Sequence, residues 1–216
     1  QDGTMRVWNA VTGEQLRTLE GHMGDVHSAV FSPDGRQIVS ASRDGTVRVW
    51  DVARSASLLP PEGYTVEVNA AAFSPDGSQI VSAGNDGTVR VWDAATGKQM
   101  HTLVGHTSWV NSAAFSPNGR QIVSAGQYDT VRVWDTTTGE QLRTLDAHTQ
   151  SANSAAFSPD GKQIVIAGDD NTVQMWDAAT GKQLHTLKGH TGEVYSAAYS
   201  PDSSQIYVVK AYDWSV

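Results

Sequence analysis

The chain has 216 residues, of which 39% are hydrophobic and 18% charged, and it contains 20 glycines and no cysteine. These proportions are typical of a globular domain with one core, and no apolar run is long enough to span a bilayer. The formal charge of -8 repels phosphate groups and disfavours nucleic acid and anionic membrane surfaces as partners. Without cysteine, disulfides, thiolate metal ligands and thiol nucleophiles are excluded.

A repeat of 42 residues organises the whole chain. Its clearest marks are five tryptophans at this spacing: Trp8, Trp50, Trp92, Trp134 and Trp176. A Phe-Ser-Pro-Asp-Gly segment recurs in step with them, with one Asn for Asp and a degenerate last copy, at residues 31–35, 73–77, 115–119, 157–161 and 199–203. We therefore expect one domain over residues 1–216, built from five repeats and a six-residue overlap, and belonging to a longer chain.

Within a repeat, short runs with alternating apolar residues predict strands. In chain order, such runs lie at residues 26–31, 37–42, 46–50 and 57–59. Pro-Asp-Gly and Asp-Gly segments separate the runs, and Asp44-Gly45 and Asp86-Gly87 are strong hairpin signals, as is Asp2-Gly3 near the start. Each repeat is thus predicted to form about four antiparallel strands, which need neighbouring repeats to bury their faces.

The repeat resembles the WD-repeat β-propeller family, in the form with near-identical copies found in bacteria. Trp-Asp pairs at 50–51, 92–93, 134–135 and 176–177, and Gly-His pairs at 21–22, 105–106 and 189–190, carry the resemblance. It implies an all-β propeller of about five four-stranded blades. The ring is either closed, with 4–8 and 15–19 joined to 194–199 and 205–209, or an open fragment of a seven-blade ring whose edges self-associate.

His22, Ser40 and Asp44 have the composition of a hydrolase triad. The resemblance instead implies a structural hydrogen-bond network of these residues with Trp50. Parts of this set recur in later repeats, at Ser82, Asp86, Trp92, His106, Ser124, Trp134, His148, Asp170, Trp176 and His190. Recurrence favours the structural interpretation, because a catalytic site is needed only once. Three positions depart from the pattern: Tyr64 replaces His, Tyr128 replaces Asp and Ile166 replaces Ser.

No motif for catalysis, a cofactor or a metal stands out, and hairpin chemistry explains the Asp-rich and Asn-rich turns without calcium. The resemblance implies a non-catalytic scaffold in the cytoplasm that binds a protein or peptide on the rim and channel face. Trp109, Tyr195 and Arg43 are the expected anchors. The other expected contact positions are Asp25, His27, Glu67, Asn69, Asn85, Asn111, Gln127, Ser151, Asn153, Asp169 and Glu193. A small-ligand or lectin-like binder, an enzyme with an unrecognised pocket, and an amplified array without a partner are the alternatives.

Overall fold

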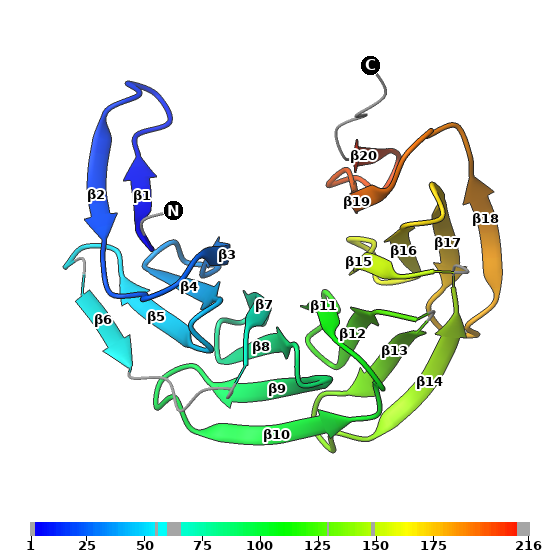
Figure 1. Ribbon diagram of the computed structural model, residues 1–216, viewed down its shortest axis with the longest axis horizontal. Coiled ribbons are helices and arrows are strands. Elements are labelled where there is room, and N and C mark those ends of the chain that lie inside the picture. The colour runs from blue at the N-terminus through cyan, green and yellow to red at the C-terminus, as the bar shows by residue number, and fades with distance from the viewer. Residues whose placement is uncertain (1–2, 55, 60–65, 129, 148–149, 211–216) are drawn as a thin grey trace.

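The computed structural model describes residues 3–54, 56–59, 66–128, 130–147 and 150–210. Every regular element in these ranges is a β-strand (Figure 1). The described residues accordingly include no helix long and apolar enough to cross a membrane. The all-β class predicted from the repeat is confirmed.

Four sheets contain four antiparallel strands each, and we call them blades 1 to 4. Blade 1 consists of β3 (Val26–Phe31), β4 (Gln37–Ser42), β5 (Val47–Asp51) and β6 (Ala56–Leu59). Blade 2 consists of β7 (Val68–Phe73), β8 (Gln79–Gly84), β9 (Thr88–Asp93) and β10 (Gln99–Val104). Blade 3 consists of β11 (Val110–Phe115), β12 (Gln121–Gly126), β13 (Thr130–Asp135) and β14 (Gln141–Asp146). Blade 4 consists of β15 (Ala152–Phe157), β16 (Gln163–Gly168), β17 (Val173–Asp177) and β18 (Gln183–Leu187).

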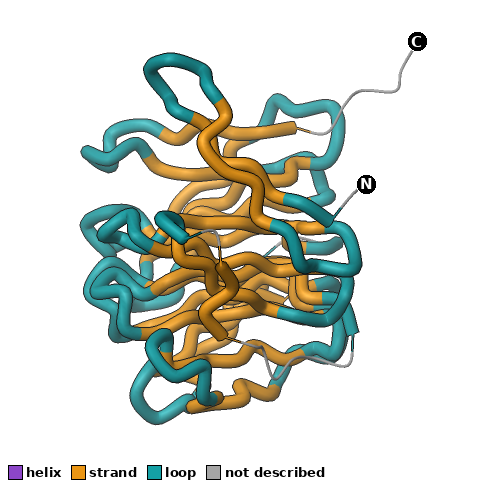
Figure 2. The backbone as a smooth tube through the Cα atoms, turned by 90° about the vertical axis from the view of Figure 1, so that its left-hand side faces the viewer, coloured by secondary structure: helices purple, strands orange, loops and turns teal. Residues whose placement is uncertain are grey.

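Two further sheets have two strands each and lie at the ends of the row of blades. The N-terminal half-blade consists of β1 (Met5–Trp8) and β2 (Gln15–Leu19), and the C-terminal half-blade of β19 (Val194–Tyr199) and β20 (Ile206–Lys210). The blades form an open arc with the half-blades on either side of the opening (Figure 1), and loops cover both ends of the strands (Figure 2). Of the two predicted forms, the structure therefore has the open one: β1–β2 and β19–β20 are separate sheets.

The Asp-Gly turns explain the tight connection between the second and third strand of a blade. Gly45 and Gly87 have φ angles of 81° and 78°, which glycine adopts without the steric cost of a Cβ. The turn aligns β4 with β5 so that Val39 lies opposite Val49. Asp2, the acidic residue of the third predicted Asp-Gly turn, lies outside the described residues.

Apolar side chains between consecutive blades form the core. Val39 and Ala41 of blade 1 pack with Val68, Ala71 and Phe73 of blade 2 in one buried cluster. Equivalent clusters join blade 2 to blade 3 and blade 3 to blade 4. Small side chains at these positions let the sheets approach closely, and the same contact is repeated along the arc.

Asparagine side chains add a polar bond at three successive contacts. Asn69 Nδ2 donates to the Val110 carbonyl at 2.9 Å, Asn111 Nδ2 to the Ala152 carbonyl at 3.0 Å and Asn153 Nδ2 to the Val194 carbonyl at 3.0 Å. Each bond links the first strand of one blade to the first strand of the next. These asparagines therefore help to set the spacing of the blades.

The variant Asn111→Ala should lower the free energy of unfolding by about 1–2 kcal/mol, because it leaves the carbonyl of the buried Ala152 without this donor. Urea unfolding followed by tryptophan fluorescence measures the change. His27 occupies the same repeat position in blade 1 and is exposed, so His27→Ala is the matched control with a smaller expected loss. Equal losses in both variants would contradict an inter-blade role for Asn111.

Candidate partner-binding rim

One end of the arc, which we call the rim face, is formed by the loops that enter each blade and the turns between its second and third strands. A repeated backbone hydrogen bond joins these two segments: Arg43 N to Asp25 O at 2.8 Å, Asn85 N to Glu67 O at 2.9 Å, Gln127 N to Trp109 O at 2.9 Å and Asp169 N to Ser151 O at 3.0 Å. The bond places the predicted contact positions of each repeat next to one another. The rim face is therefore a set of equivalent loop pairs that carry different side chains.

Blade 1 contains the complete polar network. His22 Nδ1 lies 2.9 Å from Asp44 Oδ2, and His22 Nε2 lies 2.7 Å from Ser40 Oγ. Trp50 Nε1 donates to the same Ser40 oxygen at 2.8 Å. Ser40 is 0% exposed, so its hydroxyl is not placed to meet a substrate. The arrangement ties the entry loop, through His22, to the interior of the sheet.

Burial and hydrogen bonding change the acidity of this network. Burial is the largest cause that lowers the pKa of His22, and it outweighs the opposing effect of Asp44. For Asp44, burial raises the pKa, but hydrogen bonds from Thr46, the Met23 amide and His22 together lower it to about 2. Both shifts favour a neutral imidazole held beside an ionised carboxylate.

The other blades keep parts of the network. In blade 2, Trp92 Nε1 donates to Ser82 Oγ at 2.8 Å, while Tyr64 lies outside the described residues. In blade 3, His106 Nε2 lies 2.7 Å from Ser124 Oγ, which also accepts from Trp134 Nε1 at 2.9 Å. The turn residues Asp86 and Asp170 each accept a hydrogen bond from the threonine two positions later. His190, before the C-terminal half-blade, is half-buried.

Blade 4 lacks the serine of the network. Ile166 is fully buried at that position, and Trp176 Nε1 is buried without a hydrogen-bond partner among the residues that the structure describes. His148 lies outside the described residues. A buried N–H without an acceptor is costly. Within the part of the chain that the structure describes, the indole of Trp176 therefore stabilises its blade through packing.

Because of this difference, the same substitution should have unequal effects in two blades. We expect Trp134→Phe to lower the free energy of unfolding by about 1 kcal/mol more than Trp176→Phe, since only the first variant breaks a made hydrogen bond. Both variants lose similar volume, so each controls for the packing defect of the other. Chemical denaturation of the pair measures the difference. A larger loss for Trp176→Phe would contradict the expectation.

His106 makes stability dependent on pH. Burial, followed by the positive charge of Arg132, lowers the pKa of His106 from 6.5 to about 4. Between these values the unfolded chain binds more protons than the folded protein, so stability rises with pH across this window and falls as pH is lowered through it. The buried His22 acts in the same direction.

We expect the free energy of unfolding to decrease from pH 6.5 to 4, with His106 contributing on the order of 2–3 kcal/mol. His106→Gln should remove that part of the slope, while His185→Gln, a change at an exposed histidine, should retain it. Urea titrations across the pH range provide the measurement. An unchanged slope in His106→Gln would overturn the assignment.

The rim face brings several predicted contact residues together in pairs. Arg43 Nε lies 2.7 Å from Glu67 Oε1, across the boundary between blades 1 and 2. Asn69 Nδ2 donates to Asn85 Oδ1 at 2.7 Å, and Glu67 Oε2 accepts from Asn85 at 3.2 Å. Charged and amide side chains thus form a connected polar strip over this boundary.

The same pairing continues further along the arc. Asn153 Nδ2 donates to Asp169 Oδ1 at 2.5 Å, Tyr195 OH donates to Glu193 Oε2 at 3.4 Å, and Ser108 Oγ donates to Gln127 Oε1 at 3.2 Å. His27 is exposed, and Asp25 and Ser151 are half-buried. Whether any of these side chains binds a partner stays a prediction.

Aromatic side chains project from the rim face at blade 3 and at the C-terminal half-blade. Trp109 is 50% exposed, Tyr195 is 52% exposed and Tyr128 is 71% exposed. The backbone bond from Gln127 to Trp109 places Trp109 and Tyr128 on two loops that contact each other. Tyr128 was not predicted as a contact residue, although its departure from the repeat at the Asp position was the signal that could have identified it.

No group of three or more His, Cys, Asp or Glu side chains that could hold a metal ion occurs within the described ranges. The acidic and histidine side chains of the network form hydrogen bonds instead: His22 with Ser40, Asp44 with Thr46 and Asp86 with Thr88. The rim face therefore offers hydrogen bonds, carboxylates and aromatic surfaces.

Four-stranded blades are repeated around an arc, and in blades 1 to 3 a tryptophan donates to a buried serine. These features define the chain as a propeller-type repeat protein. The family model "WD domain, G-beta repeat" matches residues 13–51, 57–93, 97–135, 139–177 and 181–216. The chain belongs to this WD-repeat family. The repeats of this family generally serve as protein-interaction scaffolds, typically bind proteins or peptides, and are generally non-catalytic.

Two curated proteins are similar over about one repeat. Nuclear distribution protein PAC1 of Mycosarcoma maydis is 40% identical over 40 residues, which is 18% of this chain and 9% of that protein. WD repeat-containing protein pop1 of Schizosaccharomyces pombe is 47% identical over 38 residues, or 18% of this chain and 5% of that protein. The matched segments thus span less than a tenth of either relative.

Proposed function

We propose that this protein is a non-catalytic scaffold whose rim face binds a basic segment of another protein, with Trp109 as the central contact. The half-exposed indole of Trp109 is the observation that carries the proposal. Its position lies outside the 42-residue tryptophan series, and the blade-forming hydrogen bond of blade 3 is made by Trp134. Exposed tryptophan and tyrosine side chains are typical anchors of protein interfaces.

The charge of the rim face supports a basic partner. Carboxylates occur at four of the predicted contact positions: Asp25, Glu67, Asp169 and Glu193. Arg43, the arginine among those positions, is already paired with Glu67. The formal charge of the whole chain is -8, which favours the approach of positively charged segments.

Aromatic and acidic groups on one face of the arc suit lysine-rich or arginine-rich peptides. A guanidinium or ammonium group can lie over an aromatic ring while a carboxylate neutralises its charge. Trp109 and Tyr128 supply rings on adjoining loops. A cytoplasmic location is part of this proposal, and fluorescence imaging of a tagged chain tests it.

Binding of labelled peptides, measured by fluorescence anisotropy, tests the proposal. Basic peptides should bind more tightly than neutral or acidic peptides of equal length, and added salt should weaken the binding. Trp109→Ala should reduce affinity by roughly 30-fold, the effect of losing an interface anchor worth about 2 kcal/mol.

Val11→Ala is the matched control, because Val11 is 95% exposed in the turn between β1 and β2, at the end of the strands opposite the rim face. This variant should bind like the unmodified chain. A preference for acidic peptides, or equal affinities of Trp109→Ala and Val11→Ala, would contradict the proposal.

A further inference from the structure

A polar hollow lies between blades 2 and 3, at the end of the strands opposite the rim face. Its volume is about 420 Å³. The turn between β7 and β8 supplies one wall, which includes Asp76 and Ser78, and the turn between β11 and β12 supplies the other, which includes Asn118. Thr136 and Thr137, directly after β13, complete the lining. Both walls belong to four-stranded blades inside the arc.

Four of the lining residues depart from the repeat, and each departure introduces an uncharged polar side chain. Ser78 replaces a basic residue, and Asn118 replaces an aspartate. Thr136 and Thr137 replace apolar residues. The corresponding residues of the other four-stranded blades are Arg36, Arg120 and Lys162 for Ser78; Asp34, Asp76 and Asp160 for Asn118; Val52, Ala94 and Ala178 for Thr136; and Ala53, Ala95 and Ala179 for Thr137. Departures on two blades thus meet in one hollow.

The asparagine at position 118 keeps the turn but changes the group that is left free. In blade 2, Asp76 Oδ1 accepts hydrogen bonds from the serine hydroxyl two positions earlier and the backbone amide two positions later, at 2.6 and 3.0 Å. In blade 3, Asn118 Oδ1 accepts the same two bonds, at 2.8 and 3.0 Å. The second group is a carboxylate oxygen in Asp76 and an N–H donor group in Asn118. Neither group has a partner among the residues that the structure describes.

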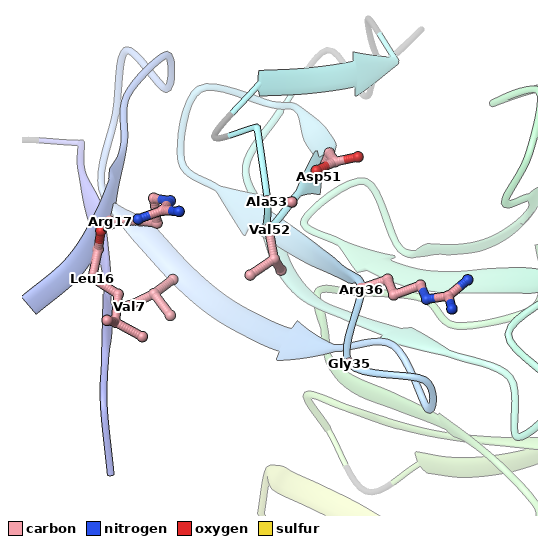
Figure 3. A pocket seen from close by; sticks show the side chains of 8 residues that line it. All are labelled: Val7, Leu16, Arg17, Gly35, Arg36, Asp51, Val52 and Ala53. Atoms are coloured by element: carbon pink, nitrogen blue, oxygen red, sulfur yellow. Dashed lines mark hydrogen bonds between the residues drawn. The ribbon is translucent and has the colours of Figure 1, made fainter. Parts of the chain in front are cut away.

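Thr136 adds a buried hydroxyl group to the same place. It is 5% exposed, and its Oγ1 has no hydrogen-bond partner within the described ranges. Figure 3 shows the corresponding position of blade 1, where the side chain of Val52 projects toward a hollow of about 430 Å³ that it lines. Blades 1, 2 and 4 form with apolar residues at this position, so the fold does not require the hydroxyl. A buried hydroxyl without a partner lowers stability, and a bond from a ligand would offset this loss.

The chemistry of the lining selects the class of ligand. The asparagine at position 118 removes a carboxylate that a cation would favour, which leaves Asp76 as the one carboxylate among the described lining residues. An anion would be repelled by Asp76, because hydrogen bonds from Ser74 and Ser78 lower the pKa of this carboxyl and keep it ionised. Hydroxyl and amide groups would lose hydrogen bonds to an apolar ligand. A neutral ligand with several hydroxyl groups fits the lining best.

We propose that this hollow binds a neutral saccharide through one of its sugar rings, at a site separate from the rim face. Adjacent sugar hydroxyls both donate and accept hydrogen bonds, which suits the free oxygen of Asp76 and the free N–H group of Asn118. A change of rotamer brings Thr136 Oγ1 to a further hydroxyl. The exposed Pro75 and Pro117 supply apolar surface for the C–H groups of the ring. The volume falls in the usual range of small-molecule sites, about 300–1,000 Å³.

An array of immobilised glycans, probed with the fluorescently labelled chain, tests the proposal. The array carries neutral oligosaccharides and, for comparison, sialylated and sulfated ones. Neutral glycans should retain the chain, and isothermal titration calorimetry then gives the dissociation constant of the glycan that retains it best. Retention by anionic glycans only, or by no glycan, would overturn the proposal.

Asn118→Asp separates recognition from folding. It restores the residue of the other four-stranded blades, so the turn keeps its hydrogen bonds, but it replaces the free N–H donor by a carboxylate oxygen. We expect this variant to weaken glycan binding by about tenfold or more. Asp160→Asn makes the reverse exchange in the same turn of blade 4, away from the hollow, and should bind like the unmodified chain. Equal affinities of the two variants would contradict the proposal.

Thr136→Ala gives an independent measurement. Alanine is the residue of blades 2 and 4, and the variant loses only a hydroxyl without a described partner. It should resist urea at least as well as the unmodified chain and bind the glycan several times more weakly. A loss of stability with unchanged affinity would show that the role of Thr136 is structural and would overturn its assignment to the site.

Trp109→Ala distinguishes this site from the rim face. Trp109 does not line the hollow, so this variant should retain full affinity for the glycan even where it loses affinity for basic peptides. A loss of glycan binding in Trp109→Ala would place the sugar on the rim face and contradict the proposal.

Discussion

Burial of apolar side chains between consecutive blades is the constraint on which this structure depends. A four-stranded sheet has two faces, and blade 2 buries both: Phe73 and Ile80 on blade 1, and Val81 and Ala83 on blade 3. Each contact removes apolar surface from water on two sheets at once, which is the main source of stability in folded proteins. A single repeat would leave both faces exposed. The repeats are therefore stable only in series.

This constraint explains which parts of the repeat can vary. Positions between the blades hold apolar residues, whereas the polar network is complete in blade 1 and incomplete in blades 2 to 4. Trp176 is buried although Ile166 replaces the serine of the network and its indole nitrogen has no hydrogen-bond partner among the described residues, so packing holds this side chain in the blade. Loops at the rim face do not form these contacts, so their side chains can differ and can serve recognition.

The sequence predicted most of the architecture, because the period, the alternating apolar residues and the turn residues are all local signals. Strands at 26–31 and 37–42 were predicted with the bounds that β3 and β4 have. The groups around His22 were also identifiable, since the network repeats in step with the fold. Tyr128 was missed as an exposed aromatic residue because exposure depends on the loops packed around it.

Residue spacing alone determined that the chain consists of five copies of a four-stranded unit, and which side chains of each copy are equivalent. Only the tertiary structure decided that the arc is open and that Asn69, Asn111 and Asn153 bond to the next blade. It also decided that Phe31 and Tyr207 remain exposed at its ends. The physical reason is that closure and exposure depend on the rotation between blades, which arises from side-chain packing summed over all contacts and is not encoded in any one repeat.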